Sequence, residues 1–157
     1  MKILVHDYAG HPFQVDLSRE LATRGHEVTH AYFHGDRGPK GRLNRASSDP
    51  VGLSFEGVRL RRPYDKASFV KRRFDDVAYG KSVAALVASR KPDIVISGNT
   101  PTEAQSSIVR SSVANGAGFV FWVQDFYSIA VSKLLRKKLG AIGAAIGGRP
   151  VEVAVIS

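Results

Sequence analysis

The chain has 157 residues, of which 43% are hydrophobic and 24% charged, which fits one globular domain and excludes wholesale disorder. It has no cysteine, which excludes a disulfide framework and a thiolate nucleophile and fits a reducing compartment. Lysine and arginine outnumber aspartate and glutamate by 23 to 14, and the resulting net charge of +9 favours polyanionic partners such as nucleic acid, anionic lipid or phosphorylated substrates.

The amino-terminal residues predict a cytoplasmic protein. Residues 1–5 are largely apolar, but His6 and Asp7 interrupt this run before it reaches the length of a signal-peptide core. No apolar stretch reaches the roughly 18 residues that a membrane span needs. We therefore expect a cytoplasmic location, with peripheral association at the inner face of the membrane as a further expectation developed below.

The first 33 residues predict a strand, a turn, a helix and a second strand. Residues 2–6 are short and apolar, as in a buried strand, and residues 7–12 contain the Gly and Pro of a turn. A helix follows and ends at Gly25, where glycine suits a left-handed cap. Its apolar stripe is predicted to consist of Phe13, Leu17, Leu21 and Ala22. Residues 26–33 complete the β-turn-α-β opening of a parallel, doubly wound sheet.

The middle of the chain predicts a loop, a strand and a long helix. Residues 34–50 are rich in Gly, Pro, Ser and charge, which predicts a mobile loop. Strand-like residues return at 51–60, as two short pieces broken at Gly57. Residues 64–90 then predict a helix, which Pro92 ends. One side of this helix carries Tyr79, Val83, Leu86, Val87 and Arg90.

The last third continues the alternation. Residues 93–98 predict a core strand, after which Thr100 suits an N-cap and Pro101 the first position of a helix that closes near residue 116. Residues 118–124 predict a buried strand with Asp125 at its tip, and the apolar flanks of Trp122 favour a place in the core over a sugar-stacking platform. The remaining segments are a basic helix (128–139), a small-residue stretch (140–148) and a final strand (151–157). The predicted fold is therefore a single Rossmann-like α/β domain over residues 1–157, with a mainly parallel sheet flanked by helices.

Three turns are candidate binding sites because ligands of open parallel sheets lie beyond the carboxyl ends of the strands. They are residues 7–12, 98–102 and 124–128. The first turn lacks the Gly-x-Gly-x-x-Gly of a dinucleotide fold, and no P-loop pattern occurs anywhere. The five histidines have no spacing typical of metal ligands, so we predict no metal site.

Each candidate residue has a functional and a structural interpretation. Gly10 lets the backbone approach a phosphate or serves as a plain turn glycine. His11 at the tip of the first turn contacts a ligand or packs within the loop. Asp125 orients or deprotonates a sugar hydroxyl or caps the next helix. His26 and His30 alternate along a strand and are more often structural or surface residues.

Several of these segments resemble one enzyme family. Residues 1–33, with Gly10-His11-Pro12 and the Arg-Gly-His-Glu-Val of 24–28, resemble the N-terminal domain of family 4 (group 1) glycosyltransferases with the GT-B fold. Residues 122–127 (WVQDFY) resemble the WVQDLYP element of bacterial enzymes that build exopolysaccharide or O-antigen. Residues 153–157 (VAVIS) resemble the strand that closes that domain.

The resemblance implies retaining transfer of a sugar from a nucleotide-sugar, often a UDP-sugar, to an acceptor hydroxyl, with no tightly bound cofactor. It implies that this chain is the acceptor-binding half and that a C-terminal donor domain acts in cis or in trans, so that the isolated chain is inactive. Gly10 would then approach the donor phosphate with His11 nearby. Asp125 would position the acceptor or act as a base. The residues implied to line the same site are Asn99, Thr100 and Tyr127.

The resemblance also favours one interpretation of the positive charge, since acceptors of this family are often lipid-linked at the cytoplasmic face. Two clusters are expected to contact an anionic membrane: Lys71, Arg72 and Arg73, and Arg136, Lys137 and Lys138. The structural interpretation of the charge is a solubilising surface. The alternative functions are a basic nucleic-acid-binding module, a Rossmann-type nucleotide-binding protein of another class, and a receiver-like regulatory domain, which lacks the expected cluster of acids. Nucleic acid is disfavoured because the basic cluster of residues 59–73 has few interleaved aromatics and the sequence has no recognition motif.

Overall fold

A computed structural model describes residues 1–35, 40–60 and 69–123 of the chain. The sequence predictions for the basic helix, the small-residue stretch and the final strand fall on residues 124–157, outside the described residues. Within the described part, no helix is long and apolar enough to cross a membrane.

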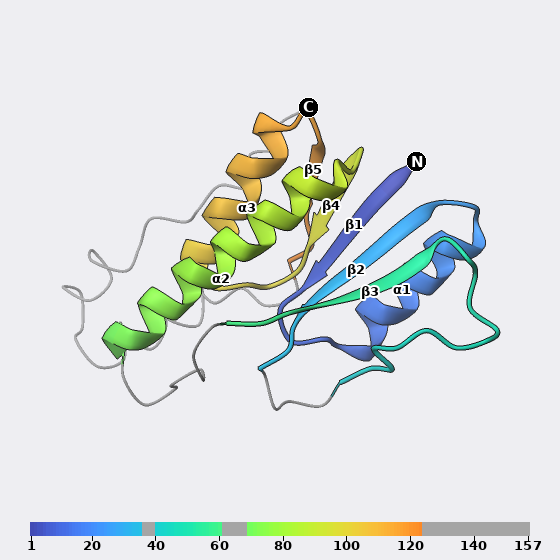
Figure 1. The fold of residues 1–157 in the computed structure, drawn as a ribbon, viewed down its shortest axis with the longest axis horizontal. Coiled ribbons are helices and arrows are strands. Elements are labelled where there is room, and N and C mark those ends of the chain that lie inside the picture. Colours follow the sequence, from blue (N-terminus) through green and yellow to red (C-terminus); the bar gives the residue numbers. More distant parts are fainter. Residues whose placement is uncertain (36–39, 61–68, 124–157) are drawn as a thin grey trace, which may run out of the picture. The chain divides into compact units, whose positions relative to one another are not determined.

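The described residues form a parallel sheet with helices between the strands, as the sequence predicted. The elements are β1 (Lys2–Asp7), α1 (Pro12–Thr23), β2 (Glu27–Phe33), β3 (Leu53–Val58), α2 (Phe69–Arg90), β4 (Ile94–Ser97), α3 (Thr102–Ala114) and β5 (Gly118–Phe121). The strand order is β3-β2-β1-β4-β5, and every pairing is parallel (Figure 1). This is a Rossmann-like α/β fold.

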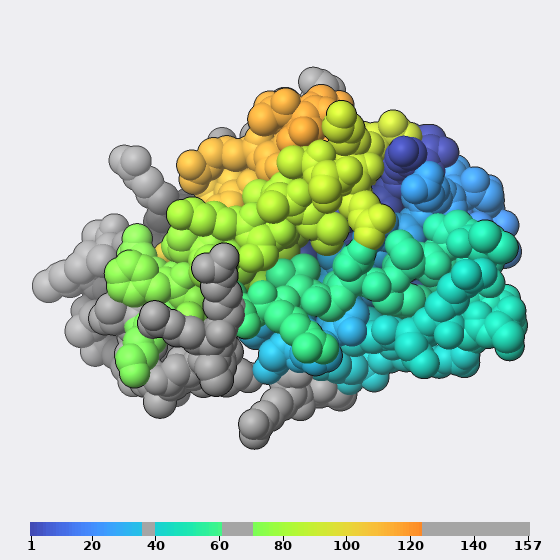
Figure 2. Space-filling model, viewed as in Figure 1, coloured from blue at the N-terminus to red at the C-terminus, as the bar shows by residue number. Residues whose placement is uncertain are grey.

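The sheet is covered on both faces, which is why β1 reads as a continuous apolar run. On one face, Leu4 packs with Tyr79 of α2 and Ile108 of α3. On the other face, Val5 packs with Ala22 of α1. The predicted inner side of α2 is confirmed at Tyr79, Val83 and Val87, all of which are buried. Near the end of α2, Arg90 pairs with Glu56 of β3, and Figure 2 shows these two segments adjoining on one face.

The predicted apolar stripe of α1 was wrong in part. Phe13 is 46% exposed, whereas the buried residues of the helix are Gln14, Val15, Ser18 and Ala22. Two of these, Gln14 and Ser18, are polar: Gln14 lies against Gly98 in the turn after β4, and Ser18 meets a polar group on the sheet. Ser18 is hydrogen-bonded to buried His30, with 2.8 Å between Oγ and Nδ1. This hydrogen bond favours the rotation of α1 that directs Ser18 toward the sheet, because burial of Ser18 and His30 without a partner would be costly.

Three local predictions also differ from the structure. β3 runs unbroken through Gly57, which pairs with Tyr32 of β2. Helix α3 begins at Thr102 with Pro101 at the N-cap, and the Thr100 hydroxyl donates to the Gly98 carbonyl instead of capping the helix. β5 was predicted to be buried, but it lies at the edge of the described sheet, and its Val120 is 49% exposed.

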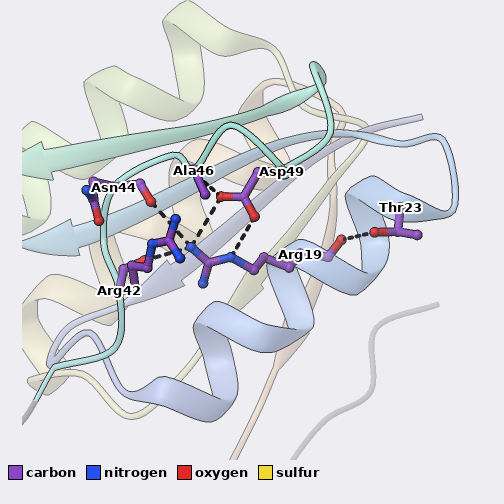
Figure 3. Close-up of polar contacts among 6 residues, drawn as sticks. All are labelled: Arg19, Thr23, Arg42, Asn44, Ala46 and Asp49. Carbon is purple, nitrogen blue, oxygen red and sulfur yellow. Dashed lines mark hydrogen bonds and ion pairs between the residues drawn. The ribbon is translucent and has the colours of Figure 1, made fainter.

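The described part of the loop before β3 is anchored to α1 (Figure 3). The Arg19 guanidinium donates to both carboxylate oxygens of Asp49, at 2.9 and 3.3 Å, and to the carbonyls of Arg42 and Asn44. Asp49 also accepts from the Ala46 amide at 2.8 Å. A charged fork of this kind gives directional hydrogen bonds that hold the loop. Residues 40–49 thus have a defined, hydrogen-bonded conformation, and their predicted mobility stays a prediction.

Candidate functional site

The carboxyl ends of β1, β4 and β5 meet at one edge of the sheet. The parallel register pairs His6 with Ser97 and Ser97 with Phe121. Beyond the strands, the Gly98 amide donates to the His6 carbonyl at 2.9 Å, and the Trp122 amide donates to the Ser97 carbonyl at 2.8 Å. The residues that directly follow β4 and β5, Gly98 and Trp122, are thus held against the neighbouring strand ends, whereas the predicted turn at residues 124–128 lies outside the described residues.

Asp7 shapes the turn between β1 and α1. Its buried carboxylate accepts hydrogen bonds from the backbone amides of Ala9, Gly10 and His11. Burial raises the pKa of Asp7, and these hydrogen bonds oppose that rise. These three backbone amides of the turn are therefore hydrogen-bonded to the Asp7 side chain.

Gly10 has structural reasons of its own for being glycine. Its φ is +78°, and an added Cβ would lie 2.9 Å from Cδ1 of Leu43 in the anchored loop. The Gly41 amide also donates to the Gly10 carbonyl at 2.8 Å. The loop and the first turn are consequently one packed unit. A phosphate contact at Gly10 stays a prediction.

His11 occupies the N-cap position of α1, and its carbonyl accepts from the amides of Gln14 and Val15. Its imidazole stacks on the ring of Phe13, with centroids 5.3 Å apart and planes 13° apart. Phe13 in turn makes an edge contact with Trp122, at 5.7 Å and 65°. Trp122 is partly buried, so its predicted place in the core was wrong. The three rings join the turn after β1 to the end of β5.

Asn99 and Thr100 follow β4 at the same edge and are partly buried. Gly98, just before them, has no room for a side chain because the amide of Gln14 lies against it. This contact places the first turn of α1 directly against the turn after β4. The structure thus brings Gly10, His11, Asn99 and Thr100 to one edge. The other predicted site residues, Asp125 and Tyr127, lie outside the described residues.

A buried polar network beneath this edge was missed by sequence reasoning. His6 Nδ1 lies 2.9 Å from Ser97 Oγ, and His6 Nε2 lies 2.8 Å from the Tyr79 hydroxyl. Ser97 donates to Gln105 Oε1 at 2.9 Å, so Ser97 accepts from His6 Nδ1–H and Nε2 accepts from Tyr79. Burial, with a smaller contribution from His30, lowers the pKa of His6 to about 3, and burial raises the pKa of Tyr79 well above its ordinary value. The network is therefore neutral and supports the strand ends from below.

A second buried histidine lies on the α1 side of the sheet. Ser18 donates to the Gln14 carbonyl, so His30 Nδ1–H donates to Ser18. Burial, with a smaller contribution from Arg19, lowers the pKa of His30 to about 4. His30 Nε2 is buried, and no described group is a hydrogen-bond partner for it. The structure bears out a structural role for His30 and excludes a surface one.

The first turns of α2 lie on the same end of the domain as the candidate site. Arg73 pairs with Glu103 in the first turn of α3 at 3.6 Å, and α3 begins just beyond the carboxyl end of β4. Lys71 and Arg72 are exposed beside it, and Phe74 is 72% exposed. The second predicted cluster, Arg136, Lys137 and Lys138, lies outside the described residues. Among the described side chains, no group of three or more His, Cys, Asp and Glu could hold a metal ion.

Comparisons with known proteins identify the fold. No protein-family model matches the chain, and no curated protein matches it. A solved structure of UGT2 from Phytolacca americana, complexed with UDP-2-fluoroglucose and pterostilbene, matches at 13% identity and a TM-score of 0.58, over 87% of this chain and 33% of that one. The glycosyltransferase of kitacinnamycin matches at 18% identity and a TM-score of 0.54, over 92% of this chain and 37% of that one. The C-terminal domain of a Pyrococcus furiosus hydrogenase matches at 17% identity and a TM-score of 0.52, over 79% of this chain and 90% of that one.

At these identities the likeness shows the fold. The chain has the Rossmann-like α/β fold found in glycosyltransferases of the GT-B type, and it spans about a third of the two glycosyltransferase chains it matches. The hydrogenase domain shares the fold as well, so the fold alone does not specify sugar transfer. The resemblance to family 4 stays a prediction.

Proposed function

We propose that this chain is the acceptor-binding half of a glycosyltransferase, which moves a sugar from a nucleotide-sugar to an acceptor hydroxyl. The observation that carries the proposal is the position of His11. Its imidazole stacks on Phe13 beyond the carboxyl end of β1, on a turn held by Asp7. Gln14 of the same helix lies against Gly98, which leads into Asn99 and Thr100 after β4. Such an edge is where ligands of this fold bind.

The residues at this edge suit the handling of a hydroxyl group. An imidazole nitrogen accepts or donates a hydrogen bond, and amide and hydroxyl side chains such as those of Asn99 and Thr100 orient neighbouring oxygens. Positioning of the reacting group contributes a large share of catalysis in enzymes generally. We assign His11 and Asn99 to acceptor positioning, which for His11 replaces the place beside the donor phosphate that the resemblance implied. Asp125 keeps its sequence-based role as a positioning group or base.

The donor side is expected elsewhere. The two similar glycosyltransferases are about three times as long as the matched region, and one of them was complexed with UDP-2-fluoroglucose and pterostilbene. These facts support a donor domain that binds a nucleotide-sugar, supplied in cis or in trans. The chain alone is then inactive in transfer, and the resemblance of residues 122–127 supports a retaining reaction.

The basic residues suggest where the acceptor is presented. Lys71, Arg72 and Arg73 lie beside exposed Phe74, on the same end of the domain as the candidate site. Basic side chains near an anionic bilayer contribute about 1 kcal/mol each, and an exposed phenyl ring adds apolar contact. This arrangement supports a lipid-linked acceptor at the cytoplasmic face of a membrane.

Titration calorimetry tests the proposed function. The purified chain is offered UDP-sugars, simple glycosides and, separately, polyprenyl-phosphate-sugars in anionic liposomes. Acceptor binding without appreciable nucleotide affinity is expected, and Asn99→Ala should weaken it. Tight binding of NAD or of nucleic acid, with no sugar or lipid bound, would refute the proposal.

A further inference from the structure

Three aromatic side chains form a continuous shelf at the candidate site. We name His11, Phe13 and Trp122 the aromatic shelf. The His11 and Phe13 rings are nearly parallel, at 5.3 Å and 13°, and the Trp122 ring meets Phe13 edge-on at 5.7 Å. These are the offset and edge-to-face arrangements that aromatic pairs prefer. The rings therefore hold one another in a defined orientation.

The shelf leaves apolar surface in water at the place where a ligand of this fold binds. Phe13 is 46% exposed although it stands in the first turn of a helix that buries the neighbouring Gln14 and Val15. A phenyl ring left this exposed forgoes much of the burial free energy available to it. Single exposed apolar residues are ordinary. Here the ring is instead held between two other rings, one of which carries the polar nitrogens of His11.

We propose that the aromatic shelf binds the acceptor through a ring that has a flat apolar face and a hydroxyl group on its edge. The flat face stacks on Phe13 while the ring edge contacts Trp122, whose plane is tilted by 65°, and the hydroxyl lies within reach of the His11 imidazole. This inference rests on the proposed function, since it names the class of acceptor. A phenol and a pyranose sugar share the required chemistry, and the experiment separates these two sources.

The chain has one tryptophan, so its indole N–H signal in a ¹H–¹⁵N NMR spectrum reports on the shelf alone. The probes are 4-methylphenol, methyl β-D-glucopyranoside and 1-hexanol, the last being an apolar alcohol without a ring. We expect the indole signal to shift with 4-methylphenol or the glucoside at millimolar concentration and not with 1-hexanol. Binding of the phenol alone assigns phenolic acceptors, and binding of the glucoside alone assigns glycan acceptors.

Variants separate stacking from a change in the fold. Phe13→Ala should raise the Kd about fivefold, since an aromatic contact contributes roughly 1 kcal/mol, whereas Phe13→Tyr keeps the flat ring and should retain binding. Val113→Ala trims an apolar side chain that is 63% exposed on α3 and is the control, with an unchanged Kd. An equal Kd for Phe13→Ala and the unaltered chain, or no selective shift with either ring, would overturn the proposal.

Failure of the shelf is distinguishable from failure of the proposed function. If calorimetry finds acceptor binding while Phe13→Ala leaves the Kd unchanged, the assignment to the acceptor half is supported and the ring-binding role of the aromatic shelf is refuted. If the shelf binds rings while NAD is also bound tightly, the ring site stands and the glycosyltransferase assignment does not.

Discussion

Acid should destabilise the fold through its two buried histidines, and His30 offers the cleaner test. Burial, with a smaller contribution from Arg19, lowers the pKa of His30 from 6.5 to about 4. Between these values the unfolded chain binds a proton that the folded chain does not. The free energy of unfolding contributed by His30 is therefore fully present above pH 6.5 and falls as the pH drops toward 4.

The magnitude follows from the two pKa values. At pH 5 His30 is still neutral in the folded chain, whereas in the unfolded chain this pH is 1.5 units below the pKa of 6.5 and the side chain is protonated. Each pH unit below the unfolded pKa corresponds to about 1.4 kcal/mol, so the contribution of His30 to the free energy of unfolding should fall by roughly 2 kcal/mol between pH 7 and pH 5. His6, whose pKa burial and His30 lower to about 3, should cost a similar amount over the same interval. Asp7 acts in the opposite direction because its pKa is raised, and its contribution cancels when two variants are compared.

The assay is urea unfolding followed by circular dichroism at pH 7, 6 and 5. The unaltered chain should lose about 2 kcal/mol more between pH 7 and pH 5 than His30→Gln, whose side chain does not titrate. Ser82→Ala, at an exposed position on α2, changes no titrating group and is the control, so its free energy of unfolding should fall as much as that of the unaltered chain. An equal loss in His30→Gln and the unaltered chain would refute the burial of a neutral histidine at this position.

Two further predictions concern packing and loop anchoring. Gly80→Ala should lower the free energy of unfolding by about 1 kcal/mol net, because the new Cβ would lie 2.6 Å from the Ala104 Cα, although helix propensity favours alanine. Thermal melts measure the effect, and Ser82→Ala, exposed on the same helix, is the control that should be neutral or slightly stabilising. Arg19→Ala should speed amide hydrogen exchange in the loop that it anchors by on the order of tenfold, whereas Arg24→Ala, which breaks an exposed pair, should leave that exchange unchanged. Unaltered exchange in Arg19→Ala would show that the loop is held by other contacts.

The order of strands and helices could be predicted because its signals are local. Apolar runs of strand length, the change to a helical period near residue 13 and the Gly or Pro at each boundary all lie within a few residues of the element they define. β1, α2 and β4 were predicted within a few residues of their described bounds. The parallel topology then placed the turns after β1 and β4 at one edge without any knowledge of side-chain contacts.

The buried polar contacts could not be predicted, because their partners are distant in the sequence. The hydrogen bond from His6 to Ser97 joins residues 91 positions apart. The burial of Gln14 and Ser18 in place of Phe13 depends on which groups the sheet presents to α1. A polar residue beside an apolar stripe looks solvated until its tertiary partner is known. Of the predicted site, Asp125 and Tyr127 stay sequence predictions.

The proposed function is tested best by locating where an acceptor binds. Backbone ¹H–¹⁵N spectra of the chain are recorded with methyl β-D-glucopyranoside and, in a separate titration, with UDP-glucose at the same concentration. We expect the glycoside to shift the signals of His11, Asn99 and Thr100, and UDP-glucose to leave them unchanged. Shifts at these residues with UDP-glucose or NAD, and none with the glycoside or with a polyprenyl-phosphate-sugar, would contradict the assignment of this domain to the acceptor side.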